Sequence, residues 1–171
     1  METWDAIRVR RNVRQYSDRA ISPDDLDRIL EAGRRAPSSM NAQRWDFVVV
    51  TDREQLQELA KVWRYGRHVA RSAATMALVV PETDDPDTAC SIEYDLGQVT
   101  MSMMLAAADL GIGSGHSAVG DQDAARLILQ VPEDHNVEWM VALGYPPDRQ
   151  LTPIENIDRR PFDDVVHREH W

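Results

Sequence analysis

The 171-residue chain contains a single cysteine, Cys90, and this scarcity excludes several classes of site. One thiol cannot form a disulfide within the chain, and it cannot supply a multi-cysteine metal centre. The five histidines show no metal-ligand spacing beside acidic or thiol partners, so no metal site is predicted. We interpret Cys90 as a small buried or half-buried hydrophobic residue.

Long apolar runs and an excess of basic charge are also missing. No stretch is apolar for long enough to span a bilayer. Residues 1–5 include the acidic residues Glu2 and Asp5, and they lack the basic segment followed by an apolar segment that is typical of a signal peptide. The formal net charge is −10, from 19 Lys and Arg residues against 29 Asp and Glu residues, which argues against a nucleic-acid partner. These absences predict a cytoplasmic protein that binds neither membranes nor nucleic acid.

The remaining composition is that of an ordinary globular protein. Hydrophobic residues make up 43% of the chain and charged residues 28%, and the length suits one domain with a sizeable core. No repeat, low-complexity tract or linker interrupts the sequence. The loosest stretch, 81–87, is too short to separate two domains. We therefore expect a single domain over residues 1–171.

Helix and strand patterns are interspersed along the chain. The first strong helix is predicted after Ser22, a favourable N-cap followed by Pro23, and it ends before Pro37. Further helices are expected over 53–63, 92–110 and 121–129, and buried apolar strands over 47–50, 76–80 and 139–143. This order of elements predicts the α+β class, with helices packed on a sheet.

The helix predicted over 92–110 is apolar around most of its circumference. Such a helix needs burial on most of its surface. A subunit interface could supply that burial in a chain of this length, or the helix could lie at the centre of the core; we favour the interface. The glycine-rich run 111–115 is interpreted as the turn that ends this helix.

Arg10, Asn12 and Arg14 form the first of four polar clusters that are candidate sites. Alternate residues of an extended segment point the same way, so these three side chains could line one wall, about 7 Å between neighbours. Guanidinium groups suit a phosphate or a developing anion. The alternative interpretation is a solvated basic patch.

The other three clusters are less specific. Residues 36–45 combine hydroxyls, an amide and free backbone groups beside a proline, which suits a planar polar ligand, although turn chemistry explains them equally. In the run 113–117, glycine lets a backbone approach a ring closely, although a helix-terminating turn is the simpler interpretation. Arg159 and Arg160 alone would be a surface charge pair.

Taken in order, these segments resemble the nitroreductase family. R-R-N-V-R at 10–14 is similar to that family's R-R-S-V-R-x-F/Y signature, and A-P-S-S-M-N-A-Q-R-W-D-F-V-V-V at 36–50 is similar to A-P-S-S-x-N-x-Q-P-W-x-F-x-V-V. D-L-G with L-A-A-A-D-L-G-I-G-S, then L-G-Y-P, and the closing R-R-P-F-D-D-V-V-H-R-E-H-W resemble its later segments. The resemblance covers nearly the whole chain.

The resemblance implies a three-layer sandwich, in which a central, mostly antiparallel sheet is flanked by helices, as an intertwined homodimer. It implies two FMN sites between the subunits and hydride supply from NADPH or NADH. The acceptor would be a nitroaromatic, quinone or enone, reduced by a ping-pong mechanism. No dedicated catalytic acid, base or nucleophile is implied, because the flavin carries the chemistry.

The family's motifs also assign FMN contacts by position in this sequence. The segment expected at the phosphate, ribityl chain and pyrimidine end comprises Arg10, Arg11, Asn12 and Arg14, with Arg14 stabilising the reduced flavin. The loop expected from the other subunit comprises Pro37, Ser38, Ser39 and Asn41. The remaining expected contacts are Gly115 and His116 at the ring face, Arg159 and Arg160 at the phosphate, and Arg67 and His68 near the ring.

Departures from the family's pattern and several alternative functions remain. Asn12 stands where the family usually has serine, and Arg44 where it usually has proline, which bears on the substrate more than on flavin binding. A flavin-storage protein without efficient turnover, a flavin oxidase or dehalogenase of the same fold, and a purely structural module stay open. The sequence identifies neither the acceptor nor the nicotinamide donor, which is NADH or NADPH.

Overall fold

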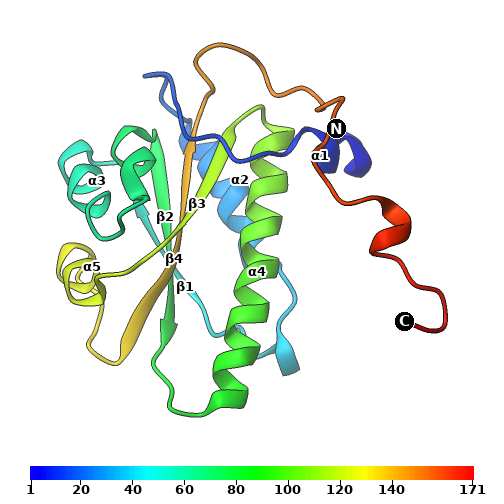
Figure 1. The fold of residues 1–171 in the computed structure, drawn as a ribbon. Coiled ribbons are helices and arrows are strands. Elements are labelled where there is room, and N and C mark those ends of the chain that lie inside the picture. Colours follow the sequence, from blue (N-terminus) through cyan, green and yellow to red (C-terminus); the bar gives the residue numbers. More distant parts are fainter.

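The computed structural model describes all residues from 1 to 171, and one antiparallel sheet forms its centre (Figure 1). The sheet has four strands in the order β1-β2-β4-β3. Their bounds are β1 Asp46–Val50, β2 Ala74–Pro81, β3 Gly113–Ala118 and β4 His135–Gly144. β4, the last strand in the chain, therefore lies inside the sheet, between β2 and β3.

The chain has five α-helices: α1 Thr3–Val9, α2 Pro23–Arg34, α3 Arg53–Leu59, α4 Pro86–Asp109 and α5 Gln122–Leu129. Four of them flank the sheet, and α1 packs against the end of α4 (Figure 1). Three short 3-10 helices complete the structure: η1 Ser39–Asn41, η2 Gly66–Arg71 and, in the C-terminal tail, η3 Phe162–Asp164. The predicted cap of α2 is confirmed, because the Ser22 hydroxyl accepts a hydrogen bond from Asp25 N at 3.2 Å and Pro23 opens the helix.

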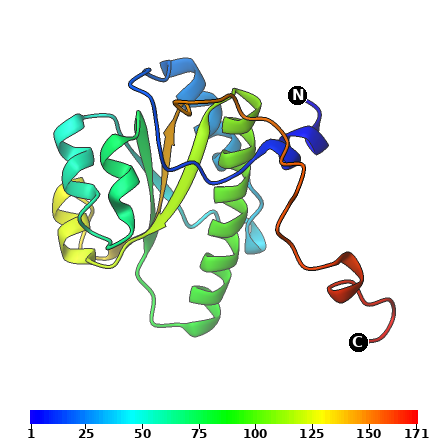
Figure 2. The same ribbon diagram turned by 45° about the horizontal axis from the view of Figure 1, so that its top comes forward.

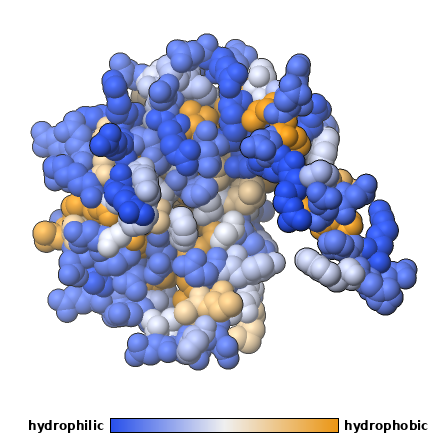
Figure 3. Space-filling model, viewed as in Figure 1, coloured by the Kyte–Doolittle hydropathy of each residue, from blue (hydrophilic) through white to orange (hydrophobic).

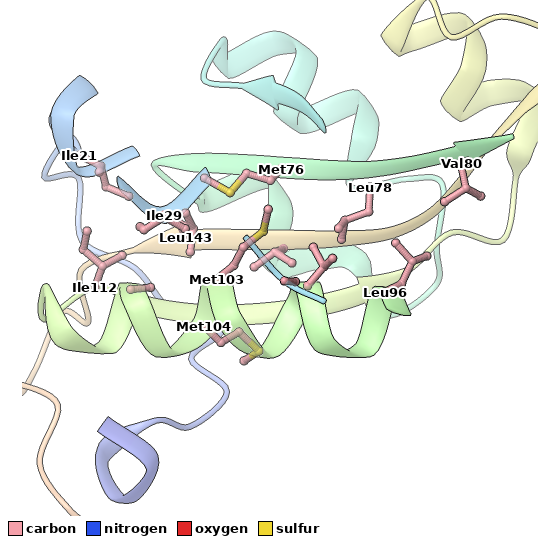
Figure 4. Packing of buried hydrophobic residues seen from close by; sticks show 14 of the residues in the cluster. Ile21, Ile29, Met76, Leu78, Val80, Leu96, Met103, Met104, Ile112 and Leu143 are labelled. Atoms are coloured by element: carbon pink, nitrogen blue, oxygen red, sulfur yellow. The ribbon is translucent and has the colours of Figure 1, made fainter. Parts of the chain in front are cut away.

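Each face of the sheet carries its own apolar core. One core fills the space between the sheet and the pair α2 and α4, where Leu78 and Leu143 face Met103 (Figure 4). The other core packs the opposite face against α3, α5 and η2 (Figure 1). Helices thus cover both faces, and the predicted α+β three-layer sandwich is confirmed. None of the helices has the length and apolar character needed to cross a membrane.

The glycine-rich run after α4 was expected to be a turn, and this prediction was wrong for Gly113–Gly115. These residues open β3, paired with β4 from Gly113↔Gly144 onward. The physical reason is space: a Cβ on Gly113 would lie 2.8 Å from the Val13 side chain, so only glycine lets the N-terminal segment lie flat on the strand.

Other differences concern helix bounds and Cys90. α1 was not predicted, and α4 begins at Pro86, capped by Asp85, rather than near Ile92. Cys90 is exposed on the second turn of α4, so the expectation of a buried thiol was wrong. α4 itself lies with one face on the core, while Tyr94 and Met101 on its other face are 73% and 43% exposed.

The C-terminal segment stands away from the body (Figures 1 and 2). Every residue from 152 to 171 is exposed. Apolar side chains are exposed on this tail and on α1 (Figure 3), namely Trp4, Ile7, Ile154, Ile157, Phe162, Val165, Val166 and Trp171. So many exposed apolar groups favour a covering partner surface.

Candidate functional site

The candidate site lies where the segment 10–14 crosses the outer edge of β3. Val13 N donates to Ser114 O at 2.7 Å, and Asn12 forms a parallel bridge with Ser114. The Ser114 carbonyl therefore points away from β4. Because backbone groups alternate along an antiparallel strand, the N–H and C=O of His116 lie on this same outer edge. The edge of β3 thus offers backbone donors and acceptors beside a basic segment.

Within the basic segment 10–14, the side chains of Arg10 and Arg14 have different neighbours from the side chain of Arg11. Burial is the largest cause that lowers the pKa of His116, and the nearby charges of Arg14 and Arg10 lower it further. Arg11 faces the other way, where its guanidinium donates to Thr152 O at 3.1 Å and lies near Arg149. The structure therefore groups Arg10 and Arg14 with β3 and places Arg11 at the start of the tail.

An open cavity of about 290 Å³ lies beside Arg10 and His116. Its apolar wall comes from the outer face of α4 and from Trp139 on β4, whose ring meets His116 edge-on with centroids 5.9 Å apart. The Nδ1 atom of His116 is buried and has no hydrogen-bond partner. An unsatisfied ring nitrogen on a mixed apolar and basic wall suits a planar polar ligand.

His68 supports β3 from η2, on the side of the segment 10–14. Its side chain is buried, and its Nε2 lies 3.3 Å from Gly115 O, so Nε2 donates and the ring is in the Nε2–H form. Burial, Arg14 and His116 together lower the pKa of His68, with burial the largest cause. The ring is therefore neutral near pH 7, and its buried Nδ1 remains without a partner.

The charges around the cavity are unevenly balanced. Neither Arg10 nor Arg14 forms an ion pair, although acidic residues outnumber basic ones in the chain. Acidic residues lie on the α4 side, where Glu93 lines the cavity. Burial, and to a smaller extent the charge of Glu93, raises the pKa of Glu138. Two unpaired guanidinium groups beside a half-buried histidine give the β3 edge the positive charge and the hydrogen-bond donors that an anion requires.

The neutral histidines predict a pH dependence of folding stability. Because burial lowers the folded pKa of His68 below its ordinary 6.5, the unfolded chain binds more protons in the window between the two values. The contribution of neutral His68 to the free energy of unfolding should be fully present well above pH 6.5 and should be lost as the pH drops through this window. His68→Gln should flatten the decline, measured as urea unfolding midpoints from about pH 7.5 to about 5.5. His167→Gln in the exposed tail is the control, and equal slopes in both variants would contradict the assignment.

The loop 37–43 lies on the other flank of α4. Pro37 lines a hollow that shares Glu93, Gly97 and Met101 with the cavity beside Arg10, so the two sites are separated by the exposed face of α4. No hydrogen bond joins Ser38, Ser39 or Asn41 to the segment 10–14. Within one chain, these two predicted groups of residues are not brought together.

Other predicted residues are also apart from the β3 edge. Arg159 and Arg160 lie in the exposed tail, where their guanidinium groups donate only to the nearby carbonyls of Asp158 and Asp164. Arg67 is exposed on η2. Three residues of this region were not predicted from the sequence: Trp139 and Glu93 as cavity walls, and Asp95 as a contact of the loop. For Asp95 a signal was present, because this aspartate stands at helical spacing with Ile92 and Val99 in an otherwise apolar stripe.

Comparison with known proteins gives a consistent result. The family model described as "Nitroreductase family" matches residues 7–66 and 63–145. A protein of Archaeoglobus fulgidus named "Putative NADH dehydrogenase/NAD(P)H nitroreductase" is 36% identical over 174 positions, which cover 96% of each chain. A protein of the same name from Methanothermobacter thermautotrophicus is 30% identical over 176 positions, 100% of this chain and 88% of that one.

Solved structures agree on the fold. The NADPH:FMN oxidoreductase of Vibrio harveyi, solved with NAD+, superposes with a TM-score of 0.85 at 24% identity, covering 99% of this chain and 77% of that one. At this identity the likeness speaks for the fold alone. The family match and the relative at 36% identity establish that the chain belongs to the nitroreductase family.

Proposed function

We propose that this protein is an FMN-dependent oxidoreductase that passes hydride from NADPH or NADH to a nitroaromatic, quinone or enone acceptor by a ping-pong mechanism. The observation that carries the proposal is the pair of unpaired arginines, Arg10 and Arg14, at an open strand edge in a chain of net charge −10. The family match and the relatives named as NAD(P)H nitroreductases support the flavin and the nicotinamide donor.

The residues at the β3 edge fit FMN. Arg10 and Asn12 would hold the phosphate and ribityl chain, and Arg14 would lie at the pyrimidine end. The outward backbone groups of His116 and the unsatisfied Nδ1 would meet the ring. FMN, when bound, supplies hydride transfer to and from a nicotinamide and an organic acceptor. The protein's own part is to hold the ring, to place charge beside it and to leave one face open.

We further propose that the active form is a homodimer. The loop residues Pro37, Ser38, Ser39 and Asn41 and the tail residues Arg159 and Arg160 would then complete the FMN site of the partner subunit. Arg11 would support the same end of the site by holding the tail at Thr152. The exposed apolar groups of the tail and α1, together with Tyr94 and Met101 on α4, support this assembly, because a partner would bury them.

An absorbance spectrum of the purified protein tests the proposed function. We expect the bands of bound flavin, directly or after reconstitution with FMN, and we expect them to bleach anaerobically on addition of NADPH or NADH. Comparing the two donors at equal concentration identifies the preferred one. Flavin bands that persist with both donors would favour a storage protein or an oxidase of the same fold. A protein that takes up no FMN would refute the proposal.

A further inference from the structure

The loop 38–43 is held in a conformation that its sequence does not favour. Met40, Asn41 and Gln43 have φ angles of 51°, 56° and 49°, and none of them is glycine. Left-handed conformations of this kind persist only where surrounding contacts enforce them. The structure must therefore contain contacts that hold this loop in its strained shape.

Most hydrogen bonds of the loop are internal and cannot attach it to the body. Asn41 N donates to Ser38 O at 2.9 Å, and Gln43 N donates to the Ser38 hydroxyl at 3.0 Å. The Gln43 side chain donates to Asn41 O at 3.1 Å. These bonds shape the turn, but they would move with it. An anchor has to come from another element.

Asp95 of α4 provides this anchor. Its two carboxylate oxygens lie 3.1 and 3.0 Å from Ser39 N, and the residue is only 3% exposed. No cation pairs with the carboxylate, and the only other donor is Gln98 Nε2, at the long distance of 3.5 Å. A buried carboxylate is unfavourable unless it accepts hydrogen bonds, so Asp95 and the Ser39 N–H depend on each other.

The position of Asp95 makes a purely space-filling role a poor explanation. Ile92 and Val99, one turn before and one turn after it on the same stripe of α4, are buried and apolar. An apolar residue would fill the position without the cost of desolvating a charge. What the carboxylate adds is a fixed acceptor directed at the first residue of η1.

We propose that Asp95 is a positioning residue, which fixes residues 38–43 in the strained shape in which the loop meets the flavin. The flavin contact in this statement rests on the proposed function, whereas the hold of Asp95 on the loop does not. Asp95 itself needs no contact with FMN, because it acts through the backbone of Ser39.

The test combines two measurements on Asp95→Ala and Asp95→Asn, with Asp87→Ala, an exposed aspartate on the first turn of α4, as the matched control. The first is amide hydrogen exchange of the segment 38–43 in flavin-free protein. The second is the Kd for FMN. We expect Asp95→Ala to speed exchange and to raise the Kd by about tenfold or more, the equivalent of one lost hydrogen bond to a charged group.

Asp95→Asn keeps one oxygen acceptor for Ser39 N, so it should show smaller changes in both measurements, and Asp87→Ala should show none. Circular dichroism melts establish that each variant is folded; if Asp95→Ala fails to fold, Asp95→Asn decides. Unchanged exchange would overturn the anchor, and faster exchange with an unchanged Kd would overturn its role toward flavin. A wild-type protein that binds no FMN would refute the proposed function instead, and the exchange data would still report the anchor.

Discussion

Arg14→Ala is expected to weaken FMN binding and to lower the reduction potential of the bound flavin. Arg14 lies at the open edge of β3 and has no ion-pair partner, and its charge lowers the pKa of both His68 and His116. A guanidinium contact that the flavin desolvates contributes about 1.5–3 kcal/mol, roughly 10- to 150-fold in Kd. The potential should fall because a positive charge beside the pyrimidine end stabilises the reduced cofactor.

The two effects are measured separately. Fluorescence titration with FMN gives the Kd, and dye-coupled anaerobic reduction at saturating FMN gives the potential. Arg19→Ala is the control, because the Arg19 Cζ atom lies 3.7 Å from the centroid of the Tyr145 ring and Arg19 is not part of the segment 10–14. In flavin-free protein, the pKa of His116 should rise in Arg14→Ala, which NMR detects without any cofactor. An unchanged potential in the fully loaded variant would exclude the assigned role of Arg14.

Gly115→Ala should damage both folding and the site. A Cβ at this position would lie 2.6 Å from the backbone oxygen of Val13, 3.2 Å from the Tyr16 hydroxyl and 3.4 Å from the His68 ring. The nearest of these atoms belongs to the backbone and cannot rotate away. The segment 10–14 would have to lift from β3, at a cost of roughly 1–3 kcal/mol, and Arg10 and Arg14 would move with it.

Urea unfolding at about pH 7.5 measures the stability loss, and FMN titration of the folded variant measures the effect on the site. Ser117→Ala, two residues farther along β3, is the matched control, because it adds no atom and removes a hydroxyl that donates only to the adjacent Ala118 carbonyl. It should cost about 1 kcal/mol or less. Wild-type stability together with a wild-type Kd in Gly115→Ala would show that the strand does not need glycine there.

The helices and apolar strands were predictable because their signals are local. A serine cap with a following proline marks the start of α2, and continuous apolar runs mark β1, β2 and β4. β3 was missed because its sequence, Gly-Ser-Gly-His-Ser-Ala, has few residues with strand propensity. What makes it a strand is the fit of its glycines against Val13 and Tyr16, and this contact joins distant parts of the chain.

In the candidate site, too, the features that depend on local backbone geometry were predictable, and those that depend on tertiary contacts were not. An extended backbone predicts that Arg10 and Arg14 point the same way, and in the structure both lie near His116. The role of Arg11 at the tail, the support of β3 by His68 and the hold of Asp95 on the loop depend on tertiary contacts. The left-handed angles of Met40 and Gln43 had no sequence signal either, because these residue types rarely adopt them, whereas asparagine, as at position 41, tolerates them. The FMN contacts themselves stay predictions.

The position of β4 inside the sheet has a consequence for how the chain folds. β2 pairs with β4 along its whole length, from Ala74↔Leu143 to Pro81↔His135, so it lacks this neighbour until residues 135–144 have been synthesised. Seven of its eight residues are buried in the finished fold, and none is charged. During synthesis this strand therefore presents an apolar edge that could pair with another nascent chain. Aggregation of this protein during expression would begin at residues 74–81, and slower translation before residue 135 would increase it.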